Sequence, residues 1–395
     1  MRARSPWALL FAACCPAIAF AALDPTDVVQ IQASASLFHD NNLFRLPKDG
    51  IRDIESDTAR ILGVGLKYDK IISRQRLIAD INLNDTTYDK NTNLDFTGGD
   101  GRVSWLWQVG NLWNGEASYR KRRELGGFED IRLKVQDLID TDTYTINGGY
   151  QFHPRWRISA EVSEQDSEHS SSTRQSLDYD AQALGMELRY RTPALNSIGL
   201  QARRTDRNYP NRLTVGFTTL DNGHRETRLN TVAAWQFTGA TKLDAQVGHI
   251  DVQHDNLSQR DFSGATWRAS ASWDTTSKLR LSLNTWKDVR LYEDNLTSYI
   301  VVKAVEFSPV YTFTPKIVLQ ADLRFERRDY RGDPGFFSIN LNREDDVRLG
   351  RVGVTYSPHR NVGLSLSYET GDRRSNIILN DYDYQAWFGT VRVGF

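Results

Sequence analysis

The stretch "ATWRASASW", residues Ala265–Trp273, alternates strictly between two kinds of side chain. Its odd positions carry Ala or Trp, and its even positions carry Thr, Arg or Ser. A period of two is typical of a β-strand whose two faces meet different surroundings. The same alternation recurs along the whole chain, in segments that begin at Val29, Leu77, Trp156, Ile317 and Val362. The sequence therefore predicts an all-β protein built from many strands with one apolar and one polar face.

The connections between these segments alternate between short and long. Short turns such as His153–Arg155 and Thr314–Lys316 are separated by long polar stretches, at 40–57, 124–142, 163–177, 208–226, 328–344 and 370–383. This alternation is typical of up-and-down transmembrane barrels, which have short periplasmic turns and long extracellular loops. We therefore expect a transmembrane antiparallel β-barrel of about 18 strands, within a range of about 16 to 18.

Composition and aromatic placement agree with a barrel. Mean hydropathy is only -0.53, because only every second strand residue would face lipid. Aromatic residues fall near the predicted ends of the strands, as the interfacial girdles of a barrel require. Those near short turns are Trp107, Trp113, Phe152, Trp156, Tyr190, Trp235, Phe237, Trp273, Phe313, Tyr356 and Phe395, and those near long loops are Phe38, Tyr119, Tyr144, Trp267 and Phe325. The alternative is a large secreted β-sandwich or solenoid, but no fixed-period repeat supports it.

Residues 1–21 are expected to be a secretory signal peptide, which leaves residues 22–395 as the barrel. Arg2 and Arg4 precede an apolar run too short to span a bilayer as a helix, and an A-x-A sequence ends at Ala21. The alternative is lipoprotein processing at Cys14. The two cysteines both lie in this leader, and its loss would change the formal charge from -1 to -3, which gives no sign of nucleic-acid binding. The expected location is the outer membrane of a Gram-negative bacterium, with its lipid as a partner.

The sequence ends on "WFGTVRVGF", in which Trp387, Val391, Val393 and Phe395 share the apolar parity. An apolar strand that finishes on an aromatic residue resembles the C-terminal signal by which the β-barrel assembly machinery recognises its substrates. We therefore expect these four residues to serve assembly, and that machinery to be a partner.

A short motif follows the first predicted strand, in "FHDNNLFRLP". The residues Asp40, Asn41, Asn42, Leu43, Phe44 and Arg45 resemble an element near the mature start of the EpsL-like, exosortase-associated exopolysaccharide outer-membrane barrels, which are close to a broader group of β-barrel porins. The resemblance implies a role in extracellular polysaccharide biosynthesis and export, with the polysaccharide and its export apparatus as partners. The alternative interpretation is a polar turn between a strand and a loop.

Charged residues on the polar parity are expected to line the lumen. They include Arg74, Arg76, Arg120, Arg122, Arg157, Arg268, Arg324, Glu116, Glu161, Asp322 and Glu326. One interpretation is that these charges pair across neighbouring strands. The other interpretation is that the arginines bind an anionic or hydroxyl-rich polymer, because guanidinium groups form forked hydrogen bonds with carboxylates and hydroxyls. Only Trp286 and Tyr330 add aromatic residues of inward parity, so no stacking track is predicted.

No catalytic, metal or cofactor site is predicted. The sequence "HIDVQH" places His249 and Asp251 on one strand face and His254 on the other, which separates possible metal ligands. Nucleophile elbows, Walker loops and H-E-x-x-H motifs do not occur. Three hypotheses remain: a channel or scaffold for exopolysaccharide export, a general or substrate-specific diffusion porin, and a barrel enzyme, of which we expect the enzyme least.

Overall fold

The computed structural model is a closed antiparallel barrel of 18 strands, which confirms the predicted fold. The structure describes residues 27–48, 50, 53–129, 134–215, 218–291, 299–332 and 342–395. The predicted signal peptide lies outside these residues. In the part of the chain described, no helix is long and apolar enough to cross a membrane.

The barrel strands are β1 (Val29–Asp40), β2 (Asp57–Ile72), β3 (Gln75–Tyr88), β4 (Phe96–Val109), β5 (Trp113–Leu125), β6 (Leu138–His153), β7 (Trp156–His169), β8 (Tyr179–Arg191), β9 (Ser197–Asn208), β12 (His224–Gln236), β13 (Thr241–His254), β14 (Phe262–Asp274), β15 (Leu279–Leu291), β16 (Tyr299–Thr314), β17 (Ile317–Arg331), β18 (Glu344–His359), β19 (Val362–Ser375) and β20 (Tyr382–Gly394). Two short strands, β10 (Leu213–Val215) and β11 (Thr218–Leu220), pair only with each other. The 3-10 helices η1 (Thr92–Leu94), η2 (Gln175–Leu177) and η3 (Ser258–Arg260) lie in connections at one end of the barrel.

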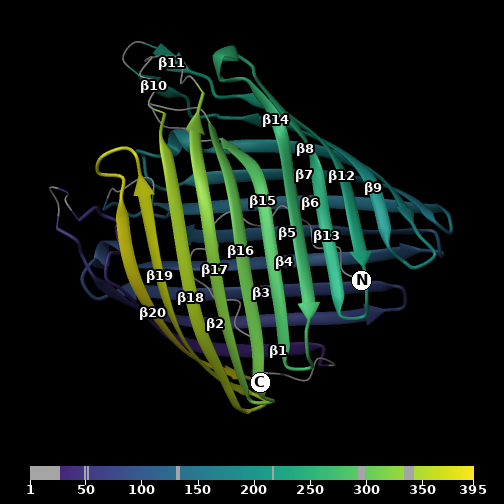
Figure 1. Cartoon of the computed structure of the whole chain (residues 1–395), viewed down its shortest axis with the longest axis horizontal. Helices are drawn as coiled ribbons and strands as arrows, with labels where there is room; N and C mark the ends of the chain where they lie inside the picture. The colour runs from purple at the N-terminus through teal and green to yellow at the C-terminus, as the bar shows by residue number, and fades with distance from the viewer. Residues whose placement is uncertain are drawn as a thin grey trace.

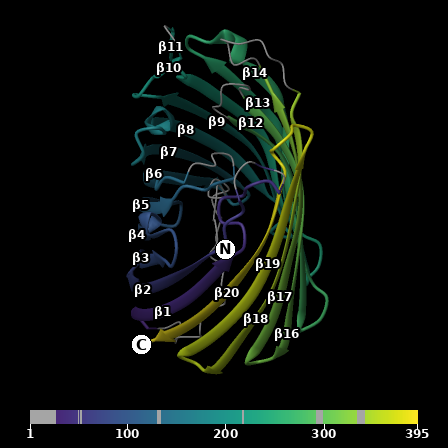
Figure 2. The ribbon, with the colours of Figure 1, turned by 90° about the vertical axis from the view of Figure 1, so that its left-hand side faces the viewer.

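Each barrel strand pairs with its neighbours in sequence, and β9 pairs with β12. The ring closes where β1 pairs with β20, in a register that runs from Gln32 opposite Gly394 to Asp40 opposite Ala386. Figure 1 shows the tilted strands of one wall crossing those of the wall behind them, and Figure 2 looks into the ring from the side. Closure pairs both edges of the sheet, as a lipid environment requires.

One end of the barrel carries short turns and the other carries the longer connections; we call these the short-turn end and the long-loop end. Two-residue turns at 73–74, 154–155, 315–316 and 360–361 join strands at the short-turn end. Several predicted long loops are wrong in extent, because β7 continues to His169, β17 to Arg331 and β19 to Ser375. These strand ends are polar on both faces, so their composition resembles that of a loop while their backbone groups stay paired.

The apolar parity of the strands faces outward. Leu62, Ile146, Leu200 and Val247 are exposed by 62% to 64%, as expected for side chains that contact lipid rather than a protein core. In the stretch quoted first, Trp267 and Trp273 lie outside and Thr266 is buried inside. This arrangement explains why a chain of low mean hydropathy carries so many exposed large hydrophobic side chains.

Aromatic side chains point outward near both ends of the barrel, including Trp113 and Phe313 at the short-turn end and Tyr144 and Phe325 at the long-loop end. Phe38 was wrongly predicted to belong to this girdle. It is buried inside the barrel and stacks on Phe388, with 4.6 Å between ring centroids. The reason is its parity, because Phe38 follows the inward residues Ser34 and Ser36 at the same two-residue spacing.

The last strand keeps its predicted orientation. Trp387, Val391 and Phe395 point outward, with Phe395 70% exposed, and Val393 is half-buried on the same parity. The backbone of Phe395 exchanges two hydrogen bonds with Ile31, at 2.8 and 3.3 Å. The terminal residue thus helps to join β20 to β1, and its role in assembly stays a prediction.

The long-loop ends of β15 and β16, as far as Leu291 and from Tyr299, fold to the lumen side of their neighbours, and we call these described strand ends the hairpin tip. β14 and β15 pair only from Trp267 opposite Lys287 to Asp274 opposite Arg280, so their long-loop ends separate. Beyond this point Val289 and Val301, on the outward parity of the hairpin, pack against Ile250 and Val252 on the inner face of β13. The hairpin therefore narrows the interior at the long-loop end.

Candidate functional site: the charged inner wall

Most of the predicted lumen charges lie on the inner face. Arg76, Glu116, Arg120, Arg122, Arg157, Glu161, Arg268, Asp322, Arg324 and Glu326 alternate with outward residues on their strands. Arg74 was wrongly assigned to the wall. It lies in the turn between β2 and β3, where it donates to the Gly110 carbonyl at 2.7 Å. A strand parity cannot be extended into a turn, because the chain reverses there.

On the wall formed by β3–β9, several arginines are paired with carboxylates one or two strands away. Arg120 and Arg122 share the carboxylate of Asp100, at 2.7 and 3.2 Å. The other close pairs are Arg76–Asp69, Arg102–Glu116 and Arg203–Glu161. Arg157 lies flat over Gly149, where a Cβ atom would come within 2.1 Å of its guanidinium. This wall therefore carries several ion pairs, and the buried Nε atoms of Arg157 and Arg207 have no hydrogen-bond partner among the described residues.

On the opposite wall, three arginines lie around Glu326 of β17. Glu326 is 5% exposed and accepts a 2.5 Å hydrogen bond from Arg328. Arg290 of β15 and Arg324 of β17 also lie near this carboxylate. The Arg324 Nε atom is buried and has no hydrogen-bond partner among the described residues. We call Arg290, Arg324, Glu326 and Arg328 the arginine cluster. Two further carboxylates adjoin it, because Glu306 is the cross-strand neighbour of Arg324 and Glu129 lies 3.6 Å from Arg328.

A second set of charges extends the arginine cluster along the wall. Arg228 of β12 binds Asp288 of β15 at 2.9 Å and also contacts Glu226. Arg268 of β14 lies 3.9 Å from the same Asp288. Because Asp288 sits near the inward tip of the β15–β16 hairpin, these pairs tie that tip to the wall. The hairpin and the arginine cluster are therefore neighbours at the narrowed part of the interior.

Sequence reasoning missed Arg228, Asp288, Arg290 and Arg328. Each has inward parity, and the alternation of its strand could have identified it. Arg328 was overlooked because it fell in a predicted loop. No pattern in the sequence signals that Arg290 and Glu326 come together, since this depends on the packing of β15 against β16 and β17.

The predicted family motif forms a compact turn that braces β1 against β20. Asp40 accepts a hydrogen bond from the backbone of Asn42 and an ion pair from Arg45, both at 2.8 Å. Asn42 donates to the carbonyls of Leu46 and Asp383, and Asn41 accepts from the backbone of Gln385 at 2.7 Å. The motif is thus a polar turn after a strand, which was the alternative interpretation of the sequence. In the structure this turn lies at the junction of β1 and β20 that closes the barrel.

Arg45 lies at the centre of this turn. Its φ angle is 55°, a left-handed conformation that is uncommon for residues other than glycine. Its guanidinium lies 3.5 Å from the centroid of the Tyr384 ring. Burial alone would lower the pKa of Arg45, but the neighbouring Asp40 carboxylate raises it above its usual value. The Arg45 guanidinium therefore keeps its charge beside Asp40.

Leu43 and Phe44 of the motif belong to a buried apolar cluster inside the barrel, together with Phe38, Phe128 and Phe388. Phe44 meets Phe128, from the β5–β6 connection, edge-on with 4.9 Å between centroids. The next residue, Glu129, reaches across the interior to Arg328 at 3.6 Å. Figure 2 shows the segment after β1 inside the ring of strands. The described parts of these two connections thus fold inward, and the β5–β6 connection meets the arginine cluster through Glu129.

More inward aromatic residues occur than the sequence analysis found. Tyr382, Tyr384 and Phe388 of β20 also point inward, but they are 5% to 7% exposed and pack in the apolar cluster. They therefore stabilise the inward segments rather than form an exposed stacking surface.

Metal binding finds no geometric support. His249 and His254 lie on opposite faces of β13, as predicted. Nowhere in the described ranges are three or more His, Cys, Asp or Glu side chains placed to hold a metal ion.

Solved structures of outer-membrane proteins share this architecture. The crystal structure of the outer-membrane protein OpdK from Pseudomonas aeruginosa superposes with a TM-score of 0.53 at 10% identity, over 93% of this chain and 99% of that one. The chain has the porin fold. A BenF-like porin from Pseudomonas fluorescens gives a TM-score of 0.52 at 10% identity, over 93% and 99% of the two chains. The porin fold also appears in OccK2 from Pseudomonas aeruginosa in complex with glucuronate, with a TM-score of 0.53, 10% identity and coverage of 93% and 98%.

The sequence itself matches one family model. Residues 226–395, which form strands β12–β20, match the family described as "Putative beta-barrel porin 2". No curated protein matches the chain. The porin-type barrel is thus supported by sequence over β12–β20 and by fold over nearly the whole chain.

Proposed function

We propose that the protein is a channel in the outer membrane of a Gram-negative bacterium and that it passes acidic, hydroxyl-rich saccharides. The arginine cluster carries this proposal, because three guanidinium groups surround a single buried carboxylate on the inner wall. The buried Nε atom of Arg324 has no hydrogen-bond partner among the described residues, and a guanidinium group in a narrowed, low-dielectric passage attracts anions. Guanidinium groups also form forked hydrogen bonds with carboxylates and hydroxyls, which acidic sugars present together.

The comparison proteins support the channel and the class of solute. They are porins, and one of them is described in complex with glucuronate, an acidic sugar. We extend this class of solute to the present chain because its inner wall offers matching chemistry. No enzymatic activity is proposed.

A second candidate function is a role in the biosynthesis and export of extracellular polysaccharide, with the polysaccharide and its export apparatus as partners. The observation that favours it is the Asp40–Arg45 motif, whose residues are built into the closing junction of the barrel. Deleting the gene should lower the amount of secreted polysaccharide if this role holds. Unchanged secretion, with a normal acidic-sugar channel, would leave only the diffusion porin.

The channel is tested in planar bilayers with the purified full-length protein. We expect anion preference in the reversal potential, and stronger current block by an oligogalacturonate than by a neutral maltooligosaccharide. The double variant R290Q/R324Q should lose both, while it keeps the Arg328–Glu326 pair. The matched control is R327Q on the outer face of the same strand, which should change neither. Absent conductance, or equal block by both sugars, would contradict the proposal.

A further inference from the structure

The outer face of β15–β18 carries a group of cations at its long-loop end. Lys287, Lys303 and Arg327 are cross-strand neighbours in one row on β15, β16 and β17. Like charges directly opposite one another on a sheet repel. Such a row is therefore stable only where anions neutralise it.

The acidic residues of this surface neutralise only part of the row. Asp329 contacts Lys303, Arg327 and Arg331 at 3.2 to 3.5 Å. Lys287 lies 5.6 Å above the ring of the outward Trp267. Neither Lys287 nor Arg348 has an acidic partner within the described parts of the chain. With Glu344 and Asp346 included, the described residues of this surface are five cations and three carboxylates, a surplus of two positive charges.

The cations lie at the upper border of the apolar band. Phe325 and Val305 are the outward residues immediately below the row, and Phe325 is 58% exposed. Arg348 is the cross-strand neighbour of Phe325. In a membrane-embedded barrel this is the level at which hydrocarbon gives way to lipid headgroups. The surplus charge therefore faces headgroups rather than acyl chains or bulk water.

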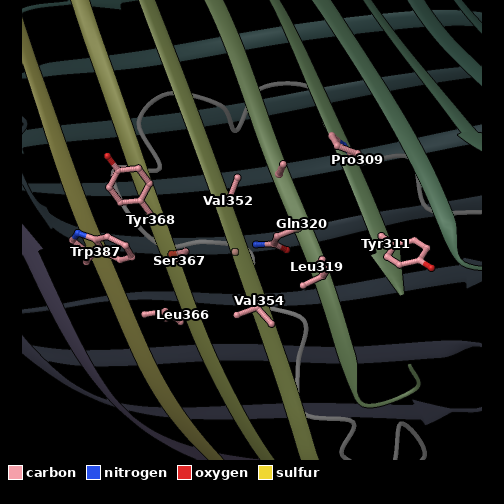
Figure 3. Close-up of a pocket in the computed structure, with 12 residues that line it drawn as sticks. Pro309, Tyr311, Leu319, Gln320, Val352, Val354, Leu366, Ser367, Tyr368 and Trp387 are labelled. Carbon is pink, nitrogen blue, oxygen red and sulfur yellow. The ribbon is translucent and has the colours of Figure 1, made fainter. Parts of the chain in front are cut away.

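An apolar groove continues from this surface down the outer wall. Tyr311, Leu319, Val352, Leu366 and Trp387 line it on strands β16–β20, and its volume is about 480 Å³ (Figure 3). Its upper residue Val352 lies four positions below Arg348, which is about 13 Å along the strand. Acyl chains of a lipid whose phosphate sits on the cations can therefore reach the groove.

We propose that the outer face of β15–β18 binds lipid A of the outer leaflet, with its phosphate groups on Lys287, Lys303 and Arg348 and an acyl chain in the groove. This inference rests on the outer-membrane location in the proposed function. Lipid A fits both parts of the surface, because it carries phosphate groups that the cations can bind and acyl chains that the groove can hold. The outer rim of β6–β8 differs, because Asp142, Asp166 and Asp180 are cross-strand neighbours there and repel phosphate.

The test is binding of purified hexa-acylated lipid A to the full-length protein in detergent, followed by native mass spectrometry. The variant is K287Q/K303Q/R348Q. Its matched control is K121Q/R123Q on the outer rim of β5, where Lys121 and Arg123 already bind Asp142 and Asp140 at 2.9 and 2.6 Å. Each Lys or Arg near an anionic lipid surface adds about fivefold in affinity. We therefore expect the triple variant to bind more than tenfold more weakly and the control to bind within twofold of the wild type.

Further measurements separate the possible outcomes. A dephosphorylated lipid A should bind the wild type as weakly as phosphorylated lipid A binds the triple variant, and A321F, which fills the groove, should weaken binding of both lipids. If the triple variant does not fold, K287Q alone should still lower affinity. Equal binding by wild type and K287Q/K303Q/R348Q would overturn the inference, as would competition by free phosphate at the concentration of the lipid. Bilayer conductance of the same samples tests the proposed channel separately, because conductance does not depend on whether lipid A binds the outer face.

Discussion

On β17, consecutive residues face opposite surroundings: Arg328 lies inside, bound to Glu326, and Arg327 lies outside, between Asp329 and Glu344. On the inner face, one carboxylate serves three guanidinium groups in a passage narrowed by inward connections. On the outer face, the cations form a row above apolar side chains. The same residue type at adjacent positions thus serves a solute path on one side and a lipid surface on the other, because strand parity alone decides which surroundings it meets.

Truncating an aromatic side chain should cost more stability inside the barrel, where it is packed, than outside, where it is exposed. Phe388 is 7% exposed and stacks on Phe38 inside the barrel, whereas Phe395 is 70% exposed outside it. Phe388→Ala should lower the free energy of unfolding by about 3 to 5 kcal/mol, because it leaves a cavity in the inner apolar cluster.

Phe395→Ala should cost far less at equilibrium in urea titrations of protein refolded in lipid vesicles. Instead, deleting Phe395 should lower the amount of heat-modifiable barrel in the outer membrane if the terminal residue is an assembly signal. Equal unfolding energies for the two alanine variants would show that the inner cluster is not a core.

An arginine introduced on the outer face of β17 should cost more stability than one introduced on its inner face. Leu323 points outward in the apolar band of β17, and Gln320 points inward on the same strand. Leu323→Arg should destabilise the barrel by about 1 to 3 kcal/mol, because an arginine facing lipid costs about 2 to 4 kcal/mol at the bilayer centre and less toward the interface. Gln320→Arg is the control and should stay within about 1 kcal/mol of the wild type in the same urea titration. A larger cost for the inward arginine would reverse our assignment of faces.

Histidines on the two faces should respond differently to pH. His224 lies inside the barrel above the apolar band, and burial together with the charge of Arg207 lowers its pKa to about 3. The folded chain therefore keeps His224 neutral, while the unfolded chain takes up a proton below about pH 6.5. The stabilisation from neutral His224 is complete above that pH and is lost as the pH falls toward 3.

Between pH 7 and pH 5 we expect His224 to account for a loss of about 1 to 2 kcal/mol in unfolding free energy. His224→Gln should remove this part of the pH dependence. The control is His249→Gln, which changes an outward histidine on the neighbouring strand β13. A pH dependence that survives in His224→Gln would assign it to other groups.

The smallest expected effect compares the two inner walls. Arg120 and Arg122 share Asp100, so R120Q/R122Q leaves that carboxylate without its cationic partners. We expect a modest shift of reversal potential toward cations, which the further change Asp100→Asn should largely cancel. Arg290 and Arg324 lie near Glu326, but within the described residues neither forms a close ion pair of the kind that Arg120 and Arg122 form with Asp100. If Asp100→Asn cancels nothing, the three side chains lie outside the conduction path.

The alternation of the strands made much of this architecture predictable, including the barrel, the strand number and the faces of residues such as Arg324 and Glu326. Parity failed at Arg74, where the chain turns. At Phe38 parity was right, and the prediction was wrong because it placed an aromatic residue near a strand end in the outer girdle. The inward tip of β15–β16 and the contact between Glu129 and Arg328 could not be predicted. Both depend on where connections fold inside the ring, and local sequence periodicity carries no information about that.

The brace around Asp40 and Asn42 also bears on the order in which the barrel forms. It joins β1 to β20, and nearby the hydroxyls of Ser36 and Thr390 meet at 2.8 Å although 354 positions separate them. Bringing such distant segments together costs about 5 kcal/mol of chain entropy. The brace recovers part of that cost with a turn whose own hydrogen bonds span only two to five residues. The turn at Asp40–Arg45 can therefore form before β20 is in place and bind β20 when the barrel closes.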